Sequence, residues 1–363
     1  GCKMGNKTRS VHIGGLRMGA GAPISVQSMT NTYTGDVEAT VAQIEQLAQA
    51  GCEVVRMAVN DAAAAAAVRE IRARVPKLPL VADVHFDYRL AIAAMENGID
   101  KIRFNPGNIG SEANVQALVS CAKMHHVPIR IGVNAGSLDR ALLARYGAPT
   151  PEALAESALG HVRILERAGF SDIVISAKVS SVPETVATYR LLAKACAYPL
   201  HVGVTEAGGS ELAIIKSAVG IGALLLDGIG DTIRVSLTGD PVREVNAGIA
   251  ILRALGLRRE GVEVISCPTC GRCKNIAAHA ALAARVEQEF QNARAYLKVA
   301  VMGCAVNGPG EAREADVGIA FGRTNAVVFK RGEQAFAGAL PGVAEQFLQE
   351  VQSMLEEREK ELA

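Results

Sequence analysis

A repeated alternation of two kinds of segment constrains the fold of this chain more than any other feature. From residue 24 to about residue 236, a short run rich in β-branched residues is followed by an Ala-rich amphipathic stretch and then by a Gly or Pro. Alternating strands and helices of this kind indicate a parallel sheet connected by helices. The predicted strands are Ile24–Ser28, Glu53–Ala58, Leu80–His85, Lys101–Asn105, Ile129–Asn134, Asp172–Lys178, Leu200–Thr205 and Thr232–Ser236.

The number of strand–helix units indicates how the sheet is arranged. Eight units favour a closed (β/α)8 TIM barrel. The alternative is an open doubly wound sheet, but no strand–GxGxxG–helix fingerprint is present. The helical stretches Asp36–Ala50 and Asp61–Val75 each open with an Asp that suits an N-cap. The segment Gly14–Gly21 precedes the first strand and is expected to form a hairpin or a lid of the barrel.

Near residue 260 the alternation stops, and we predict a second, smaller α+β domain. The domain boundaries predicted from this change are 1–258 for the barrel and 259–363 for the second domain. The predicted elements of the second domain are the strand Gly261–Ser266, the helix Ile276–Ala295, the strand Leu297–Met302, the loop Cys304–Glu311, the strands Asp316–Phe321 and Ala326–Lys330, and the helix Leu340–Leu362.

Composition excludes several classes of protein. Lys and Arg number 38 and Asp and Glu number 37, so the net charge is +1, which does not suit a protein that coats nucleic acid. Aromatic residues make up only 4 % of the chain and Trp is absent, which argues against a platform for stacking bases. No apolar run of about 18 residues indicates a membrane span. We read no signal peptide, and therefore expect a reducing, cytoplasmic setting in which cysteines serve as ligands or catalysts.

Charged residues recur in the predicted strands, near the ends that carry the active sites of TIM barrels. An ionised side chain is costly to bury in a strand without a partner, and Arg binds phosphate in a bidentate manner. The cations therefore predict a compact anionic ligand, with their number favouring a diphosphate. Ion pairs with Asp83 and Glu206, or outward-facing side chains, are the alternatives. The cations are Arg56, Arg103, Arg130, Lys178 and Arg234, and the other polar residues of these strand ends include Asp83, His85, Asn105, Asn134, Thr205 and Ser236.

Four of the eight cysteines lie within 38 positions of one another. Three form the run Cys267-Pro-Thr-Cys270-Gly-Arg-Cys273, and Cys304 follows in a segment rich in Gly and Pro. Closely spaced thiolates in such loops fit a [4Fe–4S] cluster. Structural zinc and a CxxC redox disulfide are the alternatives, and spacing alone leaves all three open.

With both halves in view, the chain closely resembles the 4-hydroxy-3-methylbut-2-enyl diphosphate synthase family of the non-mevalonate isoprenoid pathway. The resemblance covers essentially the whole chain after its first few residues. It implies a barrel like that of dihydropteroate synthases and a cluster domain like those of sulfite and nitrite reductases. The matching segments are residues 26–32, 103–110, 132–138, 205–209, 231–237, 267–270 and 307–311.

The resemblance implies a cofactor, a reaction and an assembly. A [4Fe–4S] cluster would be held by Cys267, Cys270, Cys304 and Glu311, while Cys273 has no ligand role in the family and is a departure from it. The enzyme would reduce 2-C-methyl-D-erythritol 2,4-cyclodiphosphate by two electrons, with flavodoxin or ferredoxin as the donor. The family forms head-to-tail homodimers, and closure within one chain is the alternative.

The resemblance also implies roles for the strand-end residues. Glu206 would donate a proton beside Thr205, and Asn307 would contact cluster or substrate. Asp83 and His85 are further candidates. The diphosphate would be held by Arg56, Arg103, Arg130 and Lys178, helped by Asn105, Asn134, Arg234 and Ser236. Two rival functions are a pterin- or aldol-type barrel enzyme with a zinc domain, and a non-catalytic cluster-bearing sensor.

Overall fold

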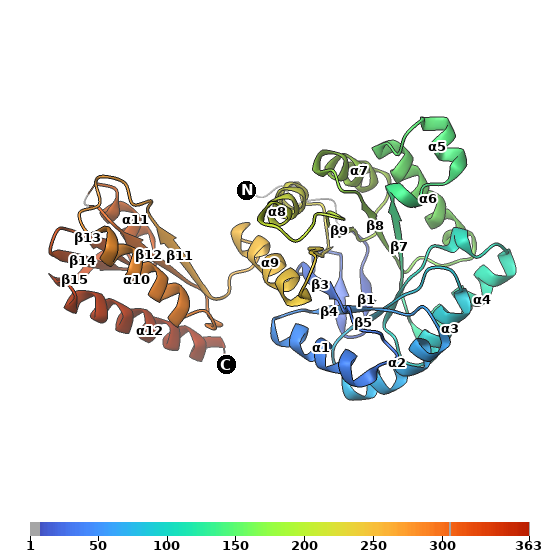
Figure 1. Ribbon diagram of the computed structural model, residues 1–363, viewed down its shortest axis with the longest axis horizontal. Helices are drawn as coiled ribbons and strands as arrows, with labels where there is room; N and C mark the ends of the chain where they lie inside the picture. Colours follow the sequence, from blue (N-terminus) through green and yellow to red (C-terminus); the bar gives the residue numbers. More distant parts are fainter. Residues whose placement is uncertain (1–7, 305, 363) are drawn as a thin grey trace. The chain divides into compact units, whose positions relative to one another are not determined.

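The computed structural model describes residues 8–304 and 306–362 and divides the chain into two compact units. The first unit ends at Leu257 and the second begins at Arg258. In the first unit, helices surround a group of parallel strands (Figure 1). None of the helices in the described part of the chain has the length and apolar content needed to span a membrane.

The first unit is a TIM barrel, as predicted. Its eight-stranded sheet has the order β8-β7-β6-β5-β4-β3-β10-β9, and all neighbouring strands are parallel. The two outer strands meet through a parallel bridge between Ile175 and Leu200, which closes the ring. The strands are β3 (Ser25–Met29), β4 (Val54–Ala58), β5 (Leu80–Asp83), β6 (Lys101–Arg103), β7 (Ile129–Asn134), β8 (Ile173–Lys178), β9 (His201–Val202) and β10 (Thr232–Ile233).

Helices cover the outside of the barrel and bury their apolar faces on the strands. Asp36 and Asp61 are N-caps, as their positions predict, and accept hydrogen bonds from Ala39 N and Ala64 N. Each such cap contributes about 1 kcal/mol. The helices are α1 (Val37–Gln49), α2 (Ala62–Arg74), α3 (Tyr88–Glu96), α4 (Glu112–His125), α5 (Arg140–Tyr146), α6 (Pro151–Arg167), α7 (Val182–Ala195), α8 (Glu211–Leu226) and α9 (Pro241–Ala254), with 3-10 turns at Pro106–Asn108 and Ala135–Ser137.

A hairpin of β1 (Val11–Ile13) and β2 (Leu16–Met18) precedes the barrel, in line with the hairpin expected there. Its apolar side chains pack on Val174 of β8. Thr8 just before it donates to Asp231, which directly precedes β10, over 2.7 Å. The hairpin therefore covers the amino ends of the strands and leaves their carboxyl ends free for a site.

The second unit is an α+β domain whose five-stranded sheet has the order β11-β12-β13-β14-β15. The pairs from β11 to β13 are parallel and those from β13 to β15 antiparallel. Its core packs side chains of α10 and α12 against the sheet. The elements are β11 (Val262–Ser266), α10 (Ile276–Glu289), β12 (Leu297–Met302), α11 (Gly308–Glu314), β13 (Val317–Phe321), β14 (Asn325–Lys330), β15 (Glu333–Ala339) and α12 (Gly342–Leu362).

The structure corrects several predicted bounds in this unit. The helix expected to reach Ala295 ends at Glu289, and the terminal helix begins at Gly342 rather than Leu340. The predicted loop Cys304–Glu311 contains the start of α11, because Pro309 lies in the first turn, where a missing N–H costs nothing. Strand β15 was not predicted.

Candidate active site

A pocket of about 210 Å³ lies at the carboxyl ends of the barrel strands. Side chains that alternate along a strand share one face, so the inward positions of neighbouring strands converge here. Most of the strand-end residues singled out from the sequence line it, whereas Asn105 and Glu206 do not. The lining is formed by Arg56, Asp83, His85, Arg103, Arg130, Gly132, Val133, Asn134, Ser176, Lys178, Thr205, Arg234 and Ser236.

Asp83 organises one wall of this pocket. Its carboxylate is 6 % exposed and lies 3.2 Å from His85 Nε2 and 3.8 Å from the nearest nitrogens of Arg56 and Arg103. Burial favours the neutral acid, but the nearby His85 ring and the two guanidinium charges outweigh it. The pKa of Asp83 therefore lies well below its usual range, and the carboxylate is ionised near neutral pH.

Glu244 supplies a second buried carboxylate that the sequence analysis missed. It lies on α9 and is 4 % exposed. It accepts hydrogen bonds from Ser28 Oγ at 3.0 Å and Leu237 N at 3.0 Å, and it pairs with Arg234 Nε at 3.4 Å. Its place on the apolar face of an amphipathic helix, one residue before buried Val245, was the available signal.

Asn105 ties two strand ends together. Its Nδ2 donates to the carbonyl of Gly132 over 2.8 Å, and its Oδ1 accepts from Gly132 N at 3.1 Å. Arg103 Nη2 donates to the same carbonyl at 3.1 Å. Because its amide is engaged by Gly132, Asn105 positions the end of β7 rather than lining the pocket.

The pocket and the layer beneath it carry more positive charge than their carboxylates balance. Burial and the nearby Arg234 lower the pKa of Arg56 to about 10. Burial and the charge of Arg130 place the pKa of Lys178 well below its ordinary value. Five strand-end basic residues face the two carboxylates described above, and their mutual repulsion, added to burial, lowers these pKa values. An anionic ligand would relieve this repulsion, so the arrangement favours one.

Two residues beneath the pocket were not proposed from the sequence as site residues. Lys101 and His201 are fully buried, and in the described part of the chain neither Lys101 Nζ nor either ring nitrogen of His201 has a hydrogen-bond partner. Burial, followed by neighbouring cations, lowers the pKa of both. Lys101 is two residues before Arg103, so the alternation along β6 was the signal for its inward direction.

Glu206 is exposed and follows Thr205 at the rim of the barrel. Its φ is +54°, in the left-handed region that is uncommon for residues other than Gly. Strained backbone of this kind is frequent in active sites. Thr205 lines the pocket, and its N–H donates to the carbonyl of Val179 over 3.2 Å.

Backbone N–H groups and the Arg272 side chain surround the sulfur atoms of the cysteines in the second unit. Gly303 N donates to Cys267 Sγ over 3.0 Å, and Arg272 Nε contacts Cys270 Sγ at 3.5 Å. This contact with Arg272 lowers the pKa of Cys270, and backbone N–H groups of Asn307 and Val306 lower that of Cys304. The charge of Arg272 interacts with Cys270, Cys304 and Cys267. The donor set is thus suited to thiolate chemistry.

The two remaining predicted residues of this group lie on the first turn of α11. Asn307 and Glu311 are exposed, and Glu311 N donates to Asn307 O over 3.2 Å. Among residues 8–304 and 306–362, no group of three or more His, Cys, Asp or Glu side chains is close enough to hold a single metal ion. A cubane cluster needs wider spacing, because each protein ligand binds a different iron atom.

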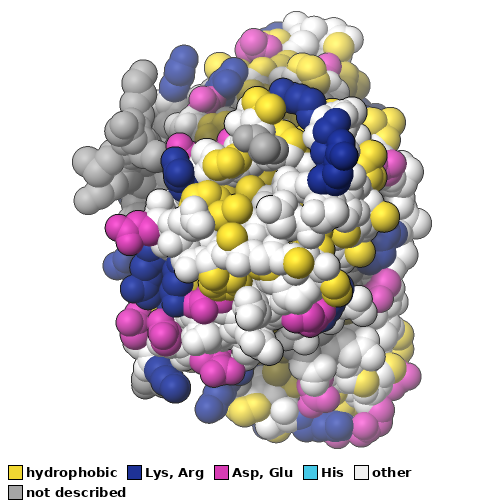
Figure 2. Space-filling view, turned by 90° about the vertical axis from the view of Figure 1, so that its left-hand side faces the viewer, with side chains coloured by type: hydrophobic (Ala, Val, Ile, Leu, Met, Phe, Trp, Pro, Cys, Tyr) yellow, Lys and Arg dark blue, Asp and Glu magenta, His cyan; other side chains and the backbone are white. Residues whose placement is uncertain are grey.

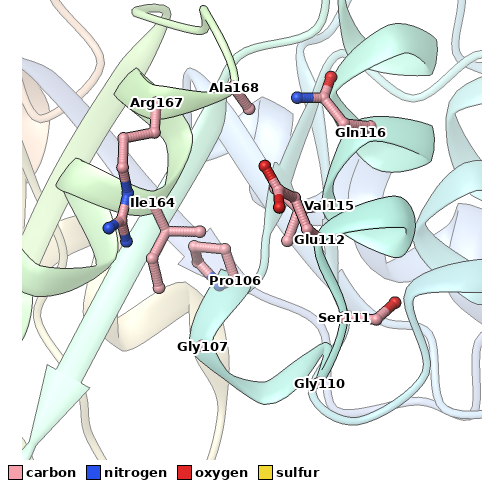
Figure 3. A pocket seen from close by; sticks show the side chains of 10 residues that line it. All are labelled: Pro106, Gly107, Gly110, Ser111, Glu112, Val115, Gln116, Ile164, Arg167 and Ala168. Atoms are coloured by element: carbon pink, nitrogen blue, oxygen red, sulfur yellow. The ribbon is translucent and has the colours of Figure 1, made fainter.

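A larger pocket, of about 400 Å³, lies outside the barrel mouth between α4 and α6 (Figure 3). Glu112 and Arg167 face each other across it, and its apolar lining includes Pro106, Val115 and Ile164. None of the site residues proposed from the sequence lines it. One carboxylate and one guanidinium balance each other there, so the pocket at the strand ends remains the better candidate for an anion site.

Comparison with known proteins identifies the family. Residues 8–249 match the GcpE TIM-barrel domain, and residues 263–353 match the GcpE protein C-terminal domain. The 4-hydroxy-3-methylbut-2-en-1-yl diphosphate synthase (flavodoxin) of Caldanaerobacter subterraneus subsp. tengcongensis is 56 % identical over 98 % of this chain and 99 % of its own length. The enzyme of the same name from Geobacter sulfurreducens is 55 % identical over 97 % and 99 %.

A solved structure supports the fold alone. Type I 3-dehydroquinate dehydratase from Clostridium difficile covers 68 % of this chain and 98 % of its own, with 12 % identity and a TM-score of 0.50. The full-length sequence matches carry the family assignment and confirm the predicted resemblance. The chain therefore belongs to the GcpE family of oxidoreductases, the 4-hydroxy-3-methylbut-2-en-1-yl diphosphate synthases.

Proposed function

We propose that this enzyme opens the ring of 2-C-methyl-D-erythritol 2,4-cyclodiphosphate by two-electron reduction and releases water and 4-hydroxy-3-methylbut-2-enyl diphosphate. The observation that carries the proposal is the group of five cations that line one pocket at the strand ends. A doubly phosphorylated ring supplies the negative charge that they lack. The names of the relatives support the identity of the product.

The pocket cations bind and orient the diphosphate. Arg56, Arg103 and Arg130 present guanidinium groups that match phosphate oxygens, and their mutual repulsion is relieved when an anion enters. The negative charge of the ligand would also raise the pKa of Lys178, because it opposes the effect of burial and so favours the protonated amine. Electrostatic stabilisation of this kind also acts on charge that develops as the ring opens.

The second unit fits the proposed [4Fe–4S] cluster. Cys267, Cys270, Cys304 and Glu311 would hold it, and the Gly303 N–H and Arg272 would stabilise the thiolate charge. Gly303 leaves room that a Cβ would fill, since that atom would lie 3.3 Å from Cys267 Sγ. When bound, the cluster supplies the two electrons one at a time. Thiolate ligands need a reducing compartment, so we propose a cytoplasmic location.

We propose Glu206 as the acid that delivers a proton to the leaving oxygen, with Thr205 beside it in the pocket. Asp83 does not suit this role, because its low pKa keeps it ionised. It positions Arg56, Arg103 and His85 instead. Asn307 lies one turn before Glu311 and would contact cluster or substrate.

The flavodoxin named for the relatives is the proposed electron donor, with ferredoxin as the alternative. We also propose that a second copy of this chain completes the assembly in a head-to-tail homodimer. Helix α8 carries Leu212, Ile215, Val219 and Leu226 on one side, each at least half exposed. Residues 3, 7 and 14 positions apart fall on one helix face, and such a stripe is typical of an interface.

The second unit also offers a surface for assembly. Val306, beside the cysteine loop, is 68 % exposed. The face shown in Figure 2 has hydrophobic and uncharged side chains over much of its centre, with most charges nearer its edges. Depletion of charge at the centre of a surface is typical of one that another protein covers.

Turnover by anaerobically purified protein tests the function. Brown, iron-loaded enzyme with a chemically reduced viologen dye should consume the cyclodiphosphate and oxidise two dye molecules per product. Arg190→Ala, an exposed cation paired with Asp227, serves as a matched control and should retain activity. No consumption by the cluster-loaded protein, or full activity of an iron-free zinc form, would overturn the proposal.

A further inference from the structure

The third thiol of the cysteine run, Cys273, is not among the proposed cluster ligands. It is buried, with 7 % of its surface exposed, and its N–H donates to the carbonyl of Cys270 over 2.9 Å. A Cβ on Gly303 would lie 2.6 Å from Cys273 Sγ and 3.3 Å from Cys267 Sγ. Together, these two distances from one point limit the separation of the sulfur atoms to at most 5.9 Å.

Gly303 is what lets the two thiols share this space. Its N–H holds Cys267 Sγ at 3.0 Å, and any larger residue would place its Cβ against Cys273. A disulfide requires sulfur atoms about 2 Å apart. The upper limit of 5.9 Å leaves at most about 4 Å for changes of side-chain rotamer to close.

We propose that Cys267 and Cys273 form an intramolecular disulfide when the cluster is absent and a low-molecular-weight disulfide such as oxidised glutathione is present. Cys273 is then a resolving thiol for a cluster ligand. The inference rests on the proposed function for the identity of Cys267 as a ligand, while the proximity of the two sulfur atoms is independent of it.

The exchange proceeds in two steps that balance. Cys267 is the more exposed of the two thiols, so its thiolate attacks one sulfur of the small disulfide, forms a mixed disulfide and expels one small thiol. The thiolate of Cys273 then attacks Cys267 Sγ and expels the second small thiol. The protein sulfur atoms lose two electrons, the small disulfide gains them, and the two S–H protons pass to the released thiols.

The consequence is protection of the ligand. A free thiolate that continues to react with oxidants reaches sulfinic and sulfonic acids, which thiols do not reverse. A disulfide between Cys267 and Cys273, by contrast, is reversible. A reducing thiol restores both free thiols, and the cluster can then be rebuilt.

Peptide mapping of the full chain tests the proposal. Iron-free protein is treated with oxidised glutathione, alkylated and digested with trypsin, which cleaves after Arg259, Arg272, Lys274, Lys298 and Arg313. The expected product joins peptide 260–272 to peptide 273–274, with fragmentation placing the bond at Cys267. Complete alkylation of the thiols, or a bond from either peptide to peptide 299–313, would overturn the proposal, as would a bond at Cys270.

Two variants sharpen the test. Cys273→Ser should leave Cys267 as its glutathione mixed disulfide, whereas Cys196→Ser, a thiol of the barrel unit, should give the same product as the wild type. A resolved disulfide in Cys273→Ser would refute the assignment. All these measurements use iron-free protein, so a negative result would reject the disulfide but leave the cluster proposal unaffected. Conversely, activity of a colourless, iron-free enzyme would reject the cluster proposal but leave the disulfide unaffected.

Discussion

Nε2 of His85 lies 3.2 Å from Oδ1 of Asp83, and the two side chains mark one side of the barrel pocket. The pKa of Asp83 is lowered relative to the unfolded chain, so its ionised form stabilises the fold above about pH 4. This contribution is lost as the pH falls below that value toward the folded-state pKa.

We expect Asp83→Asn to lower the free energy of unfolding by about 2–3 kcal/mol at pH 7, because Arg56 and Arg103, whose side chains are largely buried, lose their counter-charge. The difference from the wild type should shrink below about pH 4. Urea unfolding at pH 7 and pH 3 measures both values, with Asp227→Asn as an exposed control. An equal difference at both pH values would contradict the role given to ionisation.

Replacing a pocket arginine should weaken anion binding. Arg56→Ala removes a charge-assisted contact of about 1.5–3 kcal/mol, which corresponds to a Kd for inorganic diphosphate roughly 10–150 times higher. Arg56→Lys keeps the charge but loses the planar fork, and should recover only part of the affinity. Calorimetry measures the Kd values, and Arg190→Ala should match the wild type. An unchanged Kd in Arg56→Ala would remove this residue from the anion site.

The absence of a side chain at Gly132 should also be important for anion binding, because it leaves room for Arg103. A Cβ there would lie 3.0 Å from Arg103 Nε and from Ser176 Oγ, so Gly132→Ala should displace the guanidinium. We expect a Kd for diphosphate about ten times higher, by the loss of about one hydrogen bond. Gly136→Ala is the matched control, since its nearest neighbour, Asn134 Oδ1, is 3.7 Å away. Similar Kd values for the two variants would exclude this steric role.

Glu206 has a positive φ, and its side chain is the proposed acid. Two substitutions separate the effect of the backbone conformation from that of the carboxyl group. Glu206→Gly should stabilise the fold by up to about 1 kcal/mol, because Gly adopts a positive φ at little cost. Glu206→Gln should leave stability and diphosphate affinity near those of the wild type but strongly lower kcat. Thermal unfolding and steady-state kinetics measure the two effects. Wild-type kcat in Glu206→Gln would exclude Glu206 as the acid.

The barrel could be predicted from the sequence because its strands are distinct β-branched runs bounded by Gly and Pro. Strand β15 could not, because Glu333–Ala339 has no apolar alternation of that kind. It pairs with β14 through a two-residue turn in which Arg331 and Gly332 both have positive φ. The Asn-Gly and Asp-Gly pairs that announce such a turn are absent here.

Site residues that stand out within their own strand could be predicted from the sequence, whereas those that depend on contacts between distant parts of the chain could not. The strand-end cations were visible because Arg is conspicuous in an apolar strand. Glu244 was missed because its partner Ser28 is 216 residues away in the chain and the contact exists only after the barrel closes. Lys101 was placed in the predicted strand Lys101–Asn105 but was not considered as a site residue, because it lies at the amino end of that strand and the search was made at the carboxyl ends.

The proposed head-to-tail dimer can be tested by mixing two variants, one altered in the first unit and one in the second. The pocket lies in the first unit and the cysteine group in the second, so a head-to-tail dimer can combine an intact pocket from one copy with an intact cluster site from the other. Cys304→Ser should be inactive alone, and Arg56→Ala should be nearly inactive at substrate concentrations that only just saturate the wild type, because its affinity for the diphosphate is low. After subunit exchange, about half of the dimers should be mixed, each with one intact pair of sites, so activity should rise to roughly a quarter of the wild-type value. Leu212→Glu on α8 should weaken the dimer by light scattering, while Met124→Glu, another exposed apolar position, should not. If the mixture stays inactive although mixed dimers form, the two sites of one reaction must belong to the same chain.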